Sequence, residues 1–150
     1  MDRHFLDLEP LLIERLAERL PDEVEVQAEA DVESGQKSSG HKPRVQVIYD
    51  GYAAGSQPAL IDIRQRWLTV IVVRNVKQVS TGQAARNEAG PLATQVIRAL
   101  HRWRPPGYMP LLLVTSPWAP GYDGGRIHLP LAWETNRKET VDESEADQAG

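Results

Sequence analysis

The chain has 150 residues, a length typical of one domain, and its 41% hydrophobic and 25% charged residues indicate a globular protein. The net charge of −4 argues against a dedicated nucleic-acid-binding protein, and the absence of cysteine excludes disulfides, thiolate metal sites and cysteine nucleophiles. No apolar run approaches the roughly 20 residues that cross a bilayer and the N-terminus lacks a signal-peptide pattern, so we expect a soluble protein without membrane contact.

The N-terminal region is predicted to form a helix followed by an edge strand. Apolar residues recur there at helical spacing: Phe5, Leu8, Leu12, Leu16 and Leu20. Asp7 is the expected N-cap, and Pro21 ends the helix. Apolar and mainly acidic residues alternate over 23–29, which predicts a half-exposed strand whose acidic side suits a sheet edge. Residues 31–43 are polar and small, so we predict a loop.

The middle of the chain is predicted to contribute two strands. The first covers residues 45–49 and ends at Asp50-Gly51, before a loop that includes 55–58. The second covers 64–76, and its centre is apolar on both faces, as in a strand that lies inside a sheet. Residues 77–90 are polar and contain glycine, which predicts a second flexible loop.

The C-terminal part is predicted to contain one more helix and two strands. Pro91 suits the first position of a helix that reaches Trp103. Strands are expected over 109–115 and 126–134, and residues 122–125 form a turn rich in residues that tolerate positive φ.

These elements predict a single α+β domain over residues 1–138. Its order is α-β-β-β-α-β-β, with a mixed, mostly antiparallel sheet of about five strands and both helices on one face. Residues 139–150 contain five acidic side chains and no aromatic one, so we expect a disordered tail.

No constellation in the sequence supports catalysis, and we predict a non-enzyme without metal or cofactor. The four histidines are dispersed and lack the helical spacing of a zinc site: His4, His41, His101 and His128. Asp50 and Asp62 flank one predicted loop, but aspartate is routine in such turns. An unrecognised hydrolase remains an alternative, which a pocket of convergent, pKa-shifted groups would support.

Basic and aromatic residues are interleaved in two places, a pattern typical of nucleic-acid binding. Arg98, Arg102 and Arg104 surround Trp103, and Arg64 and Arg66 flank Trp67. Trp103, however, falls on the apolar side of its predicted helix, which favours a core position. A nucleic-acid-binding accessory protein is therefore the second alternative.

Two aromatic residues in a Pro/Gly-rich loop make a better case for protein partners. Trp118 and Tyr122 lie where little core is expected, and both residue types often dominate interface energetics. We predict that they contribute to an interface, with Arg126, Arg64 and Arg66 as charged neighbours. The alternative is that Trp118 folds back over the sheet.

Charge is segregated along the chain. Residues 1–33 hold eleven acidic and three basic side chains, a net −8, whereas residues 34–138 hold five acidic and fourteen basic ones, a net +9. Such a separation can guide head-to-tail contact between identical subunits or contact with nucleic acid. Folding can also intermix the segments and cancel it.

The pattern as a whole resembles the tail-terminator-like minor tail proteins of Mu-like, contractile-tailed phages and prophages. The matching segments are residues 8–16, 43–51, 67–75, 100–103 and 124–133. Their order and lengths span about residues 5 to 137, and the resemblance offers no active site.

This resemblance implies a virion protein that forms a ring, typically of about six copies, at the head-proximal end of the tail. Such a ring stops polymerisation of tube and sheath and docks the head–tail connector, while DNA passes through it only as cargo. The implied location is the virion tail, with the host cytoplasm as the place of assembly. Another head–tail joining subunit and a baseplate protein remain alternatives.

Overall fold

The computed structural model describes residues 4–37, 40 and 42–140 and confirms an α+β domain with a mixed sheet. It contains three helices and six strands within these residues, one helix and one strand more than expected. The helices are α1 (Leu8–Arg19), α2 (Val32–Lys37) and α3 (Gln83–Leu100). The strands are β1 (Glu25–Ala28), β2 (Arg44–Gln57), β3 (Leu60–Arg74), β4 (Leu112–Val114), β5 (Gly121–Asp123) and β6 (Arg126–Thr140).

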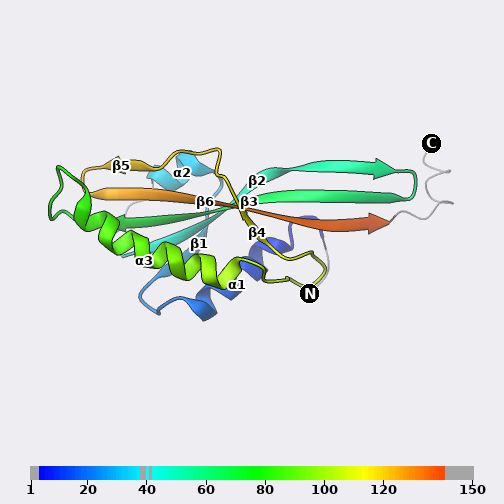
Figure 1. Cartoon of the computed structure of the whole chain (residues 1–150), viewed down its shortest axis with the longest axis horizontal. Helices are drawn as coiled ribbons and strands as arrows, with labels where there is room; N and C mark the ends of the chain where they lie inside the picture. The colour runs from blue at the N-terminus through cyan, green and yellow to red at the C-terminus, as the bar shows by residue number, and fades with distance from the viewer. Residues whose placement is uncertain (1–3, 38–39, 41, 141–150) are drawn as a thin grey trace.

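The sheet has the order β1-β2-β3-β6-β4, and β5 also pairs with β6. β1 runs parallel to β2, and every other pair is antiparallel. α1 and α3 lie together on one side of the sheet, which we call the helical face, and α2 lies on the other, the α2 face (Figure 1). The expectations of an edge position for β1 and of two long helices on one face are thus confirmed.

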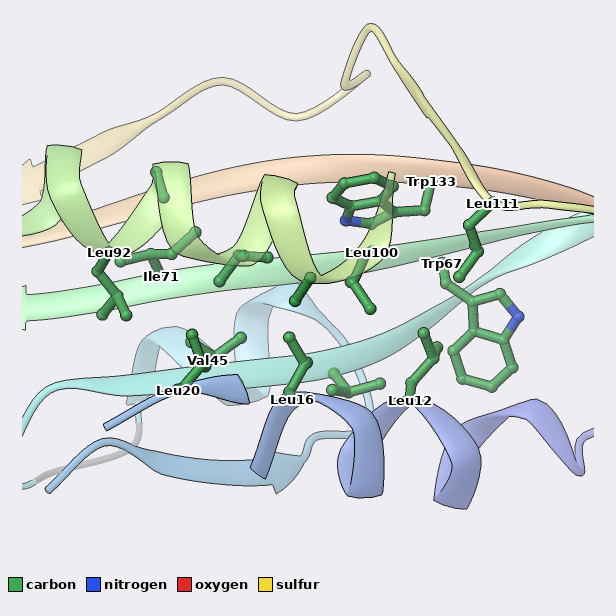
Figure 2. Close-up of a cluster of buried hydrophobic side chains, with 14 of the residues drawn as sticks. Leu12, Leu16, Leu20, Val45, Trp67, Ile71, Leu92, Leu100, Leu111 and Trp133 are labelled. Atoms are coloured by element: carbon green, nitrogen blue, oxygen red, sulfur yellow. The ribbon is translucent and has the colours of Figure 1, made fainter. Parts of the chain in front are cut away.

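The main core lies between the helical face and the two long helices (Figure 2). Leu12 and Leu16 of α1 and Leu100 of α3 are fully buried there. They pack with Trp67 and Trp133, which are opposite each other on β3 and β6. Burial of each of these large side chains contributes about 1.5–3 kcal/mol of transfer free energy, which fixes the helices on this face.

A smaller core covers the α2 face of the central strands. Its buried members are Ile48, Leu68, Val70, Val72 and Ala132. Val32 of α2 and Val114 of β4 pack against it. The centre of β3 is therefore apolar on both faces, as its sequence predicts, because helix covers one side and α2 with β4 covers the other.

Three strands extend past the helices as an arm (Figure 1). We define the arm as residues 52–57 of β2, 60–64 of β3 and 136–140 of β6, in which β3 lies between the other two. The expected loop at 55–58 is wrong, because β2 runs to Gln57 and turns tightly into β3 through Pro58 and Ala59.

The strand break expected at Asp50-Gly51 is wrong as well. The pairing register of β2 shifts between Tyr49 and Tyr52, so one extra residue is absorbed as a β-bulge. Gly51 has a φ of 101°, a backbone conformation that glycine adopts readily. The strand continues beyond the bulge into the arm.

The predicted loop at 31–43 contains α2. Asp31 caps this helix, because its carboxylate accepts a hydrogen bond of 2.7 Å from the backbone N–H of Ser34. Val32 supplies the apolar contact with the sheet. One apolar side chain in a polar segment is too weak a periodic signal to predict a helix.

The second long helix begins earlier and ends earlier than its sequence predicts. α3 begins at Gln83, so Pro91 lies inside it and not at its first position, and residues 83–90 are helical where a loop was expected. Buried Ala85 and Ala89 pack this first half against the core. At the other end, the helix stops at Leu100 because the next residues pair with the backbone of Leu111.

The last strands also differ in length from the prediction. β3 begins at Leu60 and ends at Arg74, and β4 covers only Leu112–Val114 of the expected 109–115. β6 continues to Thr140, two residues into the segment expected to be disordered. The rest of that predicted tail, 141–150, lies outside the described residues.

Candidate interaction surfaces

The five predicted interface residues lie in three separate places. Trp118 is on the α2 face and is 46% exposed. Its indole Nε1 donates to Asp50 Oδ1 at 3.4 Å, so the side chain reaches across β6 and β3 toward the bulge of β2. Trp118 thus folds over the sheet, yet nearly half of its surface stays open, and its part in an interface stays a prediction.

Tyr122 is on the helical face, since it lies opposite the core residue Ile127. Its hydroxyl donates to the backbone oxygen of Val79 at 2.6 Å. Its ring packs against Gly82, where an added Cβ would be 3.0 Å from the ring. Tyr122 therefore holds the start of α3, is 41% exposed, and does not share a surface with Trp118.

Arg64 and Arg66 lie on the α2 face at the base of the arm, on the same side as Trp118. Arg66 Nη2 pairs with Glu134 Oε1 at 3.1 Å, and Arg64 Nε lies 4.0 Å from Glu134 Oε2. The two arginines, Glu134 and Asp50 line one shallow groove. The structure thus brings together Trp118, Arg64 and Arg66 but excludes Tyr122 from this surface.

Arg126 belongs to a different, basic region of the α2 face. Its Nη2 donates to the backbone oxygen of Gly40 at 3.1 Å. Arg74 lies opposite it on β3, and His128 follows on the same face of β6. Burial lowers the pKa of His128, and the charges of Arg126 and Arg44 lower it further. Sequence reasoning missed this grouping because its members come from three strands.

A larger groove beside β4 was also missed. Its volume is about 490 Å³, and it lies on the α2 face at the base of the arm, where Arg64 of β3 and Glu134 of β6 also line it. Met109 and Leu112 line it and are each 50% exposed. The apolar run 109–115 reads as an ordinary strand, and only the shortness of β4 leaves these side chains open.

A buried polar network joins the arm to the rest of the domain. The hydroxyl of Tyr108 donates to Asp7, and Arg137 Nη1 lies 3.4 Å from Asp7 Oδ1 and 3.2 Å from the Tyr108 hydroxyl. Asp7 and Arg137 are only 5% and 8% exposed. Asp7 is the N-cap residue of α1, as expected, but its carboxylate serves this network and makes no cap hydrogen bond.

The pKa values in this network follow from its burial and hydrogen bonds. Burial raises the pKa of Tyr108 to about 12, and its hydrogen bond to Asp7 acts in the same direction. Burial works against a charged Arg137, but the hydrogen bond with Tyr108 and the nearby acidic groups outweigh it and raise the pKa of Arg137. The network therefore requires a neutral phenol between two charged groups.

We expect alkaline pH to weaken the fold through Tyr108. Because its pKa rises from 10.0 to about 12 on folding, its contribution is complete below pH 10 and is lost as pH rises through 12. The loss should be on the order of 2 kcal/mol. Urea unfolding between pH 9 and pH 12 measures it, with Tyr108→Phe as the reference for every other titrating group. Parallel pH dependence in the two proteins would contradict this assignment.

No metal-binding cluster of three or more His, Asp or Glu occurs in the described part of the chain. Asp50 accepts from Trp118 and Asp62 accepts from Asn136, and the two carboxylates line different grooves. None of the helices described is long and apolar enough to cross a membrane.

A family model described as "Phage tail terminator protein" matches residues 1–141, which covers nearly all of the chain. No curated protein matches it.

Proposed function

Because the chain belongs to the phage tail terminator family, we propose that it closes the head-proximal end of a phage tail. About six copies form a ring on the end of the tail tube and sheath of a contractile tail. The ring stops polymerisation and presents the surface on which the head–tail connector docks, while DNA passes only as cargo. The observation that carries this proposal is the family match over residues 1–141.

The charge distribution favours head-to-tail contact between copies. Exposed acidic side chains gather on α1 and beside β1, at one edge of the sheet: Glu14, Glu18, Asp22, Glu23 and Glu25. Exposed basic side chains lie on α3, on the segment that follows it and on the arm: Arg86, Arg98, Arg102, Arg104, Arg64 and Lys138. Arg98 lies beside Arg19 of α1, but β1 pairs with residues 44–47 of β2, away from the arm, so the acidic residues beside β1 and the basic residues of the arm form two unlike surfaces. Two such surfaces on one chain suit a heterologous interface, which closes into a ring when the rotation between copies closes.

The surface around Trp118 is the proposed contact with other tail or head–tail proteins. The half-exposed indole of Trp118 bonds to Asp50, which shares a groove with Arg64 and Arg66, so an apolar anchor lies near charged groups, as in interface hot spots. We assign the protein a structural role, without catalysis, cofactor or metal. Assembly takes place in the host cytoplasm under this proposal.

Solution mass tests the ring directly. We expect light scattering over a wide concentration range, or in the presence of tail tubes, to give a closed species of about six subunits, with rings visible by electron microscopy. Removal of the protein from an assembling phage should give tubes of uncontrolled length that do not join heads. Tails of normal length in the absence of the protein would contradict the proposal.

Two variants separate the parts of this proposal. Trp118→Ala should leave the ring intact and reduce attachment to partner proteins, because Trp118 is open on the α2 face. Tyr122→Ala is the comparison on the helical face, where the side chain holds α3. If both variants self-associate and assemble into particles as the wild type does, neither aromatic belongs to an interface.

A further inference from the structure

Both outer edges of the arm carry backbone groups that no described residue pairs with. β1 covers β2 only at residues 44–47, and β4 covers β6 only at residues 132–134. Beyond these points, residues 52–57 of β2 pair on one side only, with β3. Residues 137–140 of β6 likewise pair on one side only, with β3. The described arm is thus a sheet of three strands with two open edges.

Hydrogen bonds elsewhere in the two strands show which groups point outward. The backbone oxygen of Val47 accepts from the N–H of Glu29, so the backbone groups of Val47 point away from β3. The backbone groups of successive residues point alternately toward and away from β3, and the extra residue at the bulge shifts this alternation by one position. The backbone N–H and C=O of Ala54 therefore also point away from β3. On the other edge, Asn136 O accepts from Met109 N, and the same alternation turns Lys138 and Thr140 outward.

Beyond the bulge at Gly51, the β2 edge of the arm carries little of the protection that exposed edges usually have. Its sequence from Tyr52 to Gln57 contains no charged residue and no proline. Tyr52 is 61% exposed, and Ala53, Ala54, Gly55 and Gln57 are exposed as well. An exposed, uncharged edge is a template for another strand, and natural proteins block such edges with lysine, proline or a bulge unless they pair them. This edge is therefore suited to pairing.

The β6 edge offers a matching surface. The groove of about 490 Å³ lies on the α2 face beside this edge, so an added strand would border a hollow that Met109 and Leu112 line together with charged side chains such as Lys138. β2 and β6 are both antiparallel to β3 and therefore run in the same direction. Two copies whose arms point the same way can thus place a β2 edge beside a β6 edge as a parallel pair.

We propose that the β2 edge of the arm in one copy pairs with the β6 edge of the arm in the next copy. The occupant of each edge is a second copy of this chain, because one molecule carries both edges and they differ. Such a contact is heterologous, and its repetition extends one sheet from subunit to subunit around a closed ring. This inference rests on the proposed ring and specifies which strands close it.

Disulfide trapping tests the contact cleanly, because the chain has no cysteine. Double variants combine Ala53→Cys or Gln57→Cys with Lys138→Cys or Thr140→Cys, since these four side chains share the α2 face of the arm. Within one arm these positions are separated by β3, about 9–10 Å across two strand spacings, which is too far for a disulfide. Mild oxidation should therefore give a covalent ladder of subunits that ends at the ring number, whereas each single variant stops at dimers.

A second pair serves as the control for this trapping. Ala28→Cys with Leu113→Cys places thiols on β1 and β4, the outer strands of the main sheet. A ladder from this pair and none from any arm pair would overturn the arm contact while leaving the ring in place. Disulfides from the arm to tube subunits, without a ladder, would overturn it as well.

Ala54→Pro provides an independent test that does not depend on trapping. No described residue accepts from the Ala54 N–H, and proline is tolerated on such an outward edge position, so the monomer should fold normally. Loss of the N–H and the bulk of the ring should raise the concentration needed for ring formation by about tenfold or more. Ala54→Thr keeps the N–H and is the matched control.

The outcomes distinguish the contact from the function. A ring of unchanged stability in Ala54→Pro rejects arm pairing but not the terminator role. A normal arm ladder in a protein whose absence leaves tail length unchanged rejects the terminator role but not the contact. Loss of the ring in Ala54→Pro, with normal unfolding and a normal ring in Ala54→Thr, supports the contact.

Discussion

Replacement of Arg137 by methionine is expected to lower the free energy of unfolding by about 3–5 kcal/mol. Arg137 is 8% exposed and donates from Nη1 to the backbone oxygen of His4 at 2.6 Å as well as to Asp7. Methionine fills similar space but leaves the buried Asp7 carboxylate without a cation, with hydrogen bonds only from the Tyr108 hydroxyl and, at 3.4 Å, the backbone N–H of His4. An uncompensated buried charge is among the most costly changes in a protein interior.

Urea unfolding followed by tryptophan fluorescence measures this loss. Arg64→Met is the matched control, because the Arg64 side chain is 60% exposed and its ion pair with Glu134 spans 4.0 Å. Its cost should stay within about 1 kcal/mol. Asp7→Leu combined with Arg137→Met should recover much of the loss, since no charge then stays buried. A single Arg137→Met variant as stable as Arg64→Met would show that the network contributes little.

The network also explains why the arm is placed firmly against the domain. Arg137 belongs to β6 at the arm, Asp7 precedes α1, and Tyr108 lies between α3 and β4. One buried cluster thus ties the N-terminal segment and the 103–111 segment to the arm. Arg137→Met should therefore weaken ring formation more than its effect on unfolding alone accounts for, if the arm closes the ring.

The sequence predicted those elements of the fold that depend on the spacing of neighbouring residues. The leucine stripe of α1 and the two-sided apolar centre of β3 are periodic signals, and both elements form as expected. The turn at 122–125 also forms as a tight hairpin, with Gly124 and Gly125 at φ 57° and 85°. Each of these features depends on residues close in sequence.

The arm was not predictable in the same way. Its β2 segment is small and polar, and it continues as a strand because β3 pairs with it through a bulge at Gly51. Backbone pairing within this hairpin leaves no periodic signal in small side chains. The role of Asp7 was missed for another reason, since Tyr108 and Arg137 are about 100 and 130 positions away.

The candidate surface was predicted in part. Residue type alone identified Trp118 and Tyr122 as exposed aromatics, and both are more than 40% exposed. Their separation onto opposite faces depends on the pairing of β5 with β6, which places Tyr122 opposite Ile127. The grouping of Trp118 with Arg64 depends on the strand order, which sequence patterns do not give.

Trp133→Ala is the second change with a large expected effect, a loss of about 3–5 kcal/mol in the free energy of unfolding. Trp133 is 0% exposed, lies opposite Trp67 and packs in the core beneath α1 and α3. Its Nε1 donates to Thr69 Oγ1 at 2.9 Å, so the change removes a buried hydrogen bond and leaves a cavity. Urea unfolding followed by circular dichroism measures the loss without depending on the removed fluorophore.

Trp118→Ala is the matched control, because it removes the same side chain from the α2 face, where 46% of it is exposed. Its cost should be near 1 kcal/mol or less, since surface changes away from buried features have small effects. Trp133→Phe should fall between the two, because it keeps an aromatic ring and loses only the N–H bond and part of the volume. The two alanine variants therefore separate the stability of the fold from attachment to partner proteins. Trp133→Ala should reduce both, whereas Trp118→Ala should reduce attachment alone. Equal losses of stability would mean that the loop over the α2 face is part of the core, and the proposed partner surface would then have no anchor.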